Sequence, residues 1–152
     1  MNSYAGGNFI LHRDGRPALV LSDGVGIEKM KPIILSFIQD YSDVNKMVQL
    51  NLGTNAFNYK GEMDEFDKTN LRFSSIYVKN LDEFYEKINS ELKKIMFQTG
   101  MTPNIYLAGM QAFVETIYSG LEQSGLDKAN IIVGQDDVDA GCDGGCGSCG
   151  QG

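Results

Sequence analysis

The chain has 152 residues, 42% of them hydrophobic, with a formal net charge of −7 and a pI near 4.6. This length suits one domain with a sizeable core. The acidic balance argues against nucleic acid and anionic membrane surfaces as partners, because both require clustered Lys and Arg. No apolar run approaches the roughly 20 residues that span a bilayer, and no signal-peptide pattern is visible. We therefore expect a cytoplasmic protein without membrane insertion.

The first half of the chain alternates strand and helix patterns. A short apolar run predicts a strand over 18–22, and a glycine turn over 23–27 leads into a helix that begins near Glu28. Polar and apolar residues alternate over 46–52, which predicts a second strand. After a polar stretch, the sequence predicts a short helix over 62–68 and a β-branched and aromatic strand over 71–78.

The second half repeats this alternation. We expect Asp82 to be the N-cap of a long helix that Gly100 ends. An apolar strand over 104–108 runs into a helix over 111–123, and a last strand is expected over 131–133. Five strands separated by helices predict a doubly wound α/β domain with a mostly parallel five-stranded sheet and helices on both faces.

Two turns stand at the carboxyl ends of predicted strands, where doubly wound domains bind ligands. The turn over 23–27 contains Gly24 and Gly26, and the turn over 108–111 contains Gly109. Glycines let a ligand approach the backbone closely, and a helix start offers unpaired N–H donors to a phosphate. We expect these turns to form opposite lips of one crevice. Glycines used purely for connection geometry are the alternative, because a full dinucleotide fingerprint has three glycines and this turn has two.

These elements, in this order, resemble the pyridine-nucleotide half of the ferredoxin–NADP reductase superfamily of flavin-dependent electron-transfer proteins. The resemblance covers about residues 7–136. It is carried by GNFIL at 7–11, SDGVGI at 22–27, LGTN at 52–55, YLAGMQAF at 106–113 and SGLDKANII at 124–132.

The resemblance implies a site for NAD(P)H. In such a site Gly24, Val25, Gly26 and Ile27 contact the pyrophosphate, Thr54 and Asn55 flank the ribose, and Ala108, Gly109 and Met110 pack near the nicotinamide. No residue of this set is a general acid or base. Asn55 stands where relatives that prefer NADP place a basic or hydroxyl residue, which favours NADH.

The chain also departs from the family pattern. Lys29 and Met110 replace prolines, and Ala108 replaces a Cys that lies beside the nicotinamide in relatives. No flavin-domain motif precedes Gly7, so FAD or FMN has to come from another domain or chain. We expect a remnant or linker over 1–17, a nucleotide-binding domain over 18–136 and a tail over 137–152. Two explanations stay open: one domain of a longer polypeptide, or a free-standing subunit that docks elsewhere.

The tail is rich in glycine and carries all three cysteines, Cys142, Cys146 and Cys149. Thiolates at this spacing can converge on an iron–sulfur cluster or a zinc ion. The spacing resembles the first three ligands of a plant-type [2Fe–2S] site, with a first gap one residue short and no fourth Cys. A fourth ligand has to be Asp139, Asp143 or a group from outside the chain. Reduced, unligated thiols on a Gly-rich tail are the alternative.

The sequence thus favours an NAD(P)H-binding module of a flavin-dependent oxidoreductase that is not complete alone. It passes electrons from a nicotinamide to a flavin or an iron–sulfur centre. The alternative is a degenerate, non-catalytic subunit that keeps the fold and serves structure or assembly in a redox complex. A nucleotide-independent iron–sulfur carrier that uses only the tail is a weaker third reading.

Overall fold

A computed structural model describes residues 10–53 and 58–134 of the chain. Five strands and four α-helices alternate along these residues, and a short 3-10 turn at Lys128–Asn130 lies between the last α-helix and the last strand. In chain order they are β1 (Ala18–Asp23), α1 (Ile27–Gln39), β2 (Met47–Leu52), α2 (Lys60–Thr69), β3 (Phe73–Val78), α3 (Leu81–Thr99), β4 (Asn104–Ala108), α4 (Gln111–Gln123) and β5 (Ile131–Gly134).

The strands form one sheet in the order β3-β2-β1-β4-β5, and every neighbouring pair is parallel. The expected doubly wound α/β fold is confirmed, and the sheet of the described residues is parallel throughout rather than mostly so. The chain winds outward from β1 to β3 and then returns to place β4 on the other side of β1. The strand order therefore reverses between β1 and β4, and this is where such sheets bind ligands.

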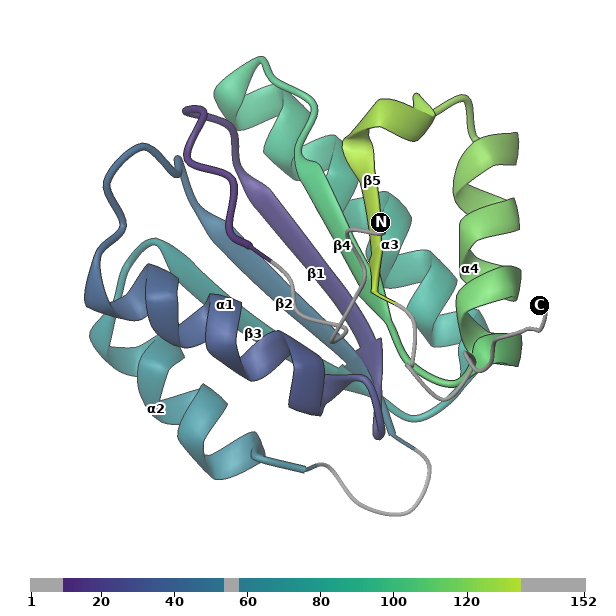
Figure 1. Cartoon of the computed structure of the whole chain (residues 1–152), viewed down its shortest axis with the longest axis horizontal. Helices are drawn as coiled ribbons and strands as arrows, with labels where there is room; N and C mark the ends of the chain where they lie inside the picture. The colour runs from purple at the N-terminus through teal and green to yellow at the C-terminus, as the bar shows by residue number, and fades with distance from the viewer. Residues whose placement is uncertain (1–9, 54–57, 135–152) are drawn as a thin grey trace, which may run out of the picture.

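Helices cover both faces of the sheet (Figure 1). Successive side chains of a strand point to opposite faces, so Val20 packs with α1 and α2, whereas Leu19 and Leu21 pack with α3 and α4. All three side chains are fully buried. This two-sided burial explains why the central strands are nearly continuous apolar runs.

Several element ends differ from the sequence-based expectation. The N-cap of α3 is Asn80 rather than Asp82: its side-chain oxygen accepts a hydrogen bond from the Glu83 N–H at 2.8 Å. Asp82 lies in the first turn, where its charge still favours the helix dipole. The α2 helix begins two residues early, after Tyr59 in the left-handed conformation. Gly100 ends α3 in the left-handed conformation, as expected.

None of the helices within residues 10–53 and 58–134 has both the length and the apolar character that a membrane crossing requires.

The carboxyl ends of β1 and β4 touch through Gly26. A Cβ atom built on Gly26 would lie 2.1 Å from the Ala108 carbonyl oxygen and 2.8 Å from the Gly109 nitrogen. Gly24, two residues earlier, has room: its Cβ would meet only Asn58 Nδ2, at 3.9 Å. Gly26 is thus required by the close approach of two backbones, and Gly24 is not.

We expect Gly26→Ala to lower the free energy of unfolding by roughly 2 kcal/mol or more, because an added methyl group forces the two backbones apart. Gly24→Ala is the matched control and should change stability by less than about 1 kcal/mol. Urea denaturation followed by circular dichroism measures both. Equal stability of the two variants would contradict the described contact between the strand ends.

Candidate functional site

Three groups of residues are predicted to hold the dinucleotide, and the structure brings two of them together. Gly24–Ile27 follow β1, Ala108 ends β4, and Gly109 and Met110 form the turn into α4. Because β1 and β4 pair in parallel with Ser22 opposite Ala108, both turns lie at the same edge of the sheet. Thr54 and Asn55 lie outside the described residues, as do Cys142, Cys146 and Cys149.

Asp23, the last residue of β1, joins the two turns. Its Oδ1 accepts hydrogen bonds from the backbone N–H of Val25 at 3.0 Å and of Gly26 at 2.7 Å. Its Oδ2 accepts one from the N–H of Met110 at 2.9 Å, across 87 residues of sequence. Both carboxylate oxygens thus bind backbone donors, and these donors come from both turns.

The next donors at the start of α1 point to backbone carbonyls. The N–H groups of Lys29 and Met30 donate to the Gly26 carbonyl at 3.0 and 3.2 Å, and that of Glu28 donates to the Val25 carbonyl at 3.3 Å. A diphosphate therefore reaches the amides of Val25 and Gly26 only if the Asp23 side chain turns away. Asp23 is partly exposed to solvent.

A buried asparagine supports the base of this turn. Asn51 Nδ2 donates to Ser22 Oγ at 2.9 Å and to the Asp23 carbonyl at 3.0 Å. Asn51 and Ser22 are both fully buried, which is unusual for polar residues. Within the described residues, Asn51 Oδ1 has no hydrogen-bond partner. The carboxamide therefore fixes the backbone from which the Asp23 side chain projects.

The residues that follow the undescribed 54–57 segment are fastened to the same turn. Asn58 Nδ2 donates to the Gly24 carbonyl at 2.9 Å, and the Tyr77 hydroxyl donates to the Asn58 carbonyl at 3.0 Å. The Tyr59 hydroxyl donates to Glu28 Oε2 at 2.6 Å. The structure thus brings the chain after β2 to the glycine turn, although the two predicted ribose residues themselves are not described.

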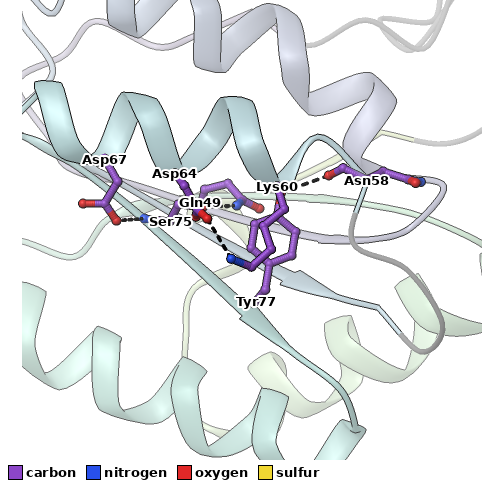
Figure 2. Close-up of polar contacts among 7 residues, drawn as sticks. All are labelled: Gln49, Asn58, Lys60, Asp64, Asp67, Ser75 and Tyr77. Carbon is purple, nitrogen blue, oxygen red and sulfur yellow. Dashed lines mark hydrogen bonds and ion pairs between the residues drawn. The ribbon is translucent and has the colours of Figure 1, made fainter.

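Figure 2 shows the polar group behind this attachment, on β2, β3 and α2. Gln49 Nε2 donates to Ser75 Oγ at 3.0 Å, and Asp67 Oδ2 accepts from the Ser75 N–H at 2.9 Å. Burial raises the pKa of Tyr77 to about 12, and the charge of Asp64 adds to this. Tyr77 is therefore protonated at neutral pH and serves as the donor that holds Asn58.

Each of the two turns carries one exposed apolar residue. Val25 and Met110 are 48% and 61% exposed, and their backbone N–H groups donate to the Asp23 carboxylate. Across the described part of the chain, no group of three His, Cys, Asp or Glu residues could hold a metal ion.

Sequence reasoning missed the role of Asp23. An Asp followed by Gly signals a turn in which the carboxylate binds amides two or three residues on, so the local bonds were predictable. The bond to the Met110 N–H depends on the pairing of β1 with β4, which no local pattern encodes.

Comparisons with known proteins identify the fold. No protein-family model and no curated protein sequence matches the chain. Solved structures do match. The flavohem-like FAD/NAD-binding domain of nitric oxide dioxygenase from Vibrio cholerae aligns with 19% identity and a TM-score of 0.61, over 85% of this chain and 54% of that one.

Two further matches have the same fold. The ferredoxin reductase in carbazole 1,9a-dioxygenase aligns with 14% identity and a TM-score of 0.62, over 85% of this chain and 40% of that chain. The CS-b5R domains of human Ncb5or, solved in the NAD+ form, align with 13% identity and a TM-score of 0.62, over 83% of this chain and 39% of that chain.

This chain thus spans about half or less of the length of these proteins. At such low identities the matches establish the fold alone. The described residues have a ferredoxin reductase-like α/β fold.

Proposed function

We propose that this chain is the NAD(P)H-binding module of a flavin-dependent oxidoreductase. The observation that carries the proposal is the meeting of two glycine turns where the strand order reverses between β1 and β4. Sheets of this type bind their ligands at that edge. The structural matches include a domain described as binding FAD and NAD and one solved in the NAD+ form, which supports this placement.

The proposed site assigns one task to each turn. The amides of Gly24, Val25, Gly26 and Ile27 hold the diphosphate once the Asp23 side chain has turned away, and the backbone of Ala108, Gly109 and Met110 packs near the nicotinamide. Thr54 and Asn55 flank the ribose. When bound, the nicotinamide supplies a hydride, and the protein sets distance and orientation. The exposed apolar side chains of Val25 and Met110 suit the task of excluding water.

We propose NADH rather than NADPH as the preferred dinucleotide. A 2′-phosphate requires a free cation near the chain that follows β2. Two lysines in that region already have carboxylate partners: Lys31 pairs with Glu62 at 3.3 Å, and Lys60 pairs with Asp64 at 2.7 Å. The Glu28 carboxylate, bound to the Tyr59 hydroxyl, adds a further negative charge on this side.

The partner in this proposal is a flavin domain or a flavoprotein subunit that carries FAD or FMN. The electrons then pass to that flavin or to an iron–sulfur centre. The nitric oxide dioxygenase domain, which is about twice as long as the matched region, is described as binding both FAD and NAD. The exposed Val25 and Met110 lie at the edge where such a partner has to approach the nicotinamide.

A second function is favoured by one specific observation. The Asp23 carboxylate accepts hydrogen bonds from backbone amides of both turns. This arrangement is expected of a protein that has kept the fold but no longer binds the ligand. In that case the chain is a non-catalytic subunit with a structural or assembly role in a redox complex.

Titration calorimetry with NADH and NADPH separates the two functions. We expect saturable heat with NADH at concentrations below about 1 mM, which corresponds to at least about 4 kcal/mol of binding free energy, and weaker heat with NADPH. Gly26→Ala should weaken NADH binding, and Asp127→Ala, a change at the distant 3-10 turn, should not. The absence of any heat with both dinucleotides up to several millimolar would refute the first function.

The cysteine tail stays a separate proposal, in which Cys142, Cys146 and Cys149 hold an iron–sulfur cluster or a zinc ion. We expect protein purified without oxygen to contain about one metal site per chain. An iron–sulfur cluster would absorb visible light, whereas a zinc ion would not. Replacing all three cysteines with Ser should remove the metal. Metal-free, colourless protein with three free thiols would contradict the proposal.

A further inference from the structure

We propose that Asp23 is a built-in occupant of the diphosphate site, so that its carboxylate competes with a bound dinucleotide for the same backbone amides. This inference rests on the proposed function for the identity of the natural ligand. It goes beyond that function because it proposes that the side chain of Asp23 controls the apparent affinity of the site.

The geometry of the contact is that of an anion bound by two segments. Oδ1 accepts from Val25 and Gly26, and Oδ2 accepts from Met110, all at 2.7–3.0 Å. A turn closed only by its own residues would need only the first two bonds. The third ties the carboxylate to a turn 87 residues away, on the other side of the position expected for the ligand.

The surroundings of the carboxylate leave little space between the turns. A Cβ atom on Gly109 would lie 2.7 Å from Asp23 Cγ and 2.7 Å from Oδ1. The Asp23 side chain therefore lies directly against the second turn, where a residue larger than glycine does not fit. A diphosphate cannot share this position with the carboxylate, because both are anions that need the same N–H groups.

The Asp23 carboxylate can nevertheless move out of the diphosphate site. Asp23 is partly exposed, and its main chain is held independently by Asn51, which donates to the Asp23 carbonyl. Rotation of the side chain therefore frees the three amides without unfolding the turn. The apparent affinity of the site is then its intrinsic affinity reduced by the fraction of molecules in which Asp23 points away.

Two variants of Asp23 test the inference. Asp23→Asn keeps the shape and an acceptor for the local amides but removes the charge and one acceptor oxygen. Asp23→Ser keeps a short acceptor for the local turn and cannot reach Met110. Asp127→Ala is the matched control, because Asp127 likewise accepts a backbone bond two residues on, from Ala129 at 3.0 Å, and lies at a different loop.

The first probe is inorganic pyrophosphate, followed through the amide nitrogen and proton shifts of Val25, Gly26 and Met110. We expect both Asp23 variants to bind it at least about tenfold more tightly than the wild type and the Asp127→Ala control, with shifts at these three amides. The second probe is NADH, measured by calorimetry, with the same expected gain.

The outcomes separate the inference from the function on which it rests. Tighter pyrophosphate binding at the three amides, with no NADH binding by any protein, supports the inference and refutes the NAD(P)H function. Equal NADH and pyrophosphate affinities in the wild type and the Asp23 variants overturn the inference and leave the function standing. Pyrophosphate shifts at other amides also overturn it. If the Ser variant does not fold, the Asn variant decides.

Discussion

The structure depends on one interaction, the Asp23 carboxylate between the ends of β1 and β4. Those strands are neighbours in the sheet but lie far apart in the sequence, and each is followed by a turn into a helix. The carboxylate binds an amide of each turn and so fixes where α1 and α4 begin relative to one another. Gly26 and Gly109 are the residues that make this approach possible, because neither position has room for a side chain.

The hydrogen bonds to Asp23 stabilise the fold, and they compete with the proposed binding of an anionic ligand at the two turns. Hydrogen bonds from backbone amides to a charged group each contribute about 1.5–3 kcal/mol, somewhat less where water competes. A fold that satisfies its own helix-start donors in this way is stable without ligand, and a ligand has to displace the internal bonds before it gains its own. The charge of −7 on the whole chain adds to the difficulty for an anionic ligand. If the proposed function holds, the isolated chain is therefore expected to bind a dinucleotide weakly.

Periodicity alone predicted most of the fold. The strand at 104–108 and the helix at 111–123 match the structure residue for residue, because a short, mostly apolar run and an amphipathic repeat leave few alternatives. Element ends were harder. Asn80 and Asp82 are both good caps, and the choice between them depends on which residue takes the extended conformation, here Asn80. Tyr59 takes the left-handed conformation, which a tyrosine rarely does, at the start of α2. The sequence predicted which two turns lie together but not the contacts between them. The hydrogen bond from the Met110 N–H to Asp23 depends on the strand order, which no local pattern encodes.

Detection of the hydrogen bonds to Asp23 tests this account most directly. In a uniformly 13C- and 15N-labelled sample, couplings across hydrogen bonds should join the Asp23 side-chain carboxyl carbon to the amide nitrogens of both Gly26 and Met110, and both amides should exchange slowly with solvent. A coupling to Gly26 alone, with a Met110 amide that exchanges as fast as an unprotected one, would show an ordinary local turn. That result would contradict the claim that one carboxylate joins the two strand ends.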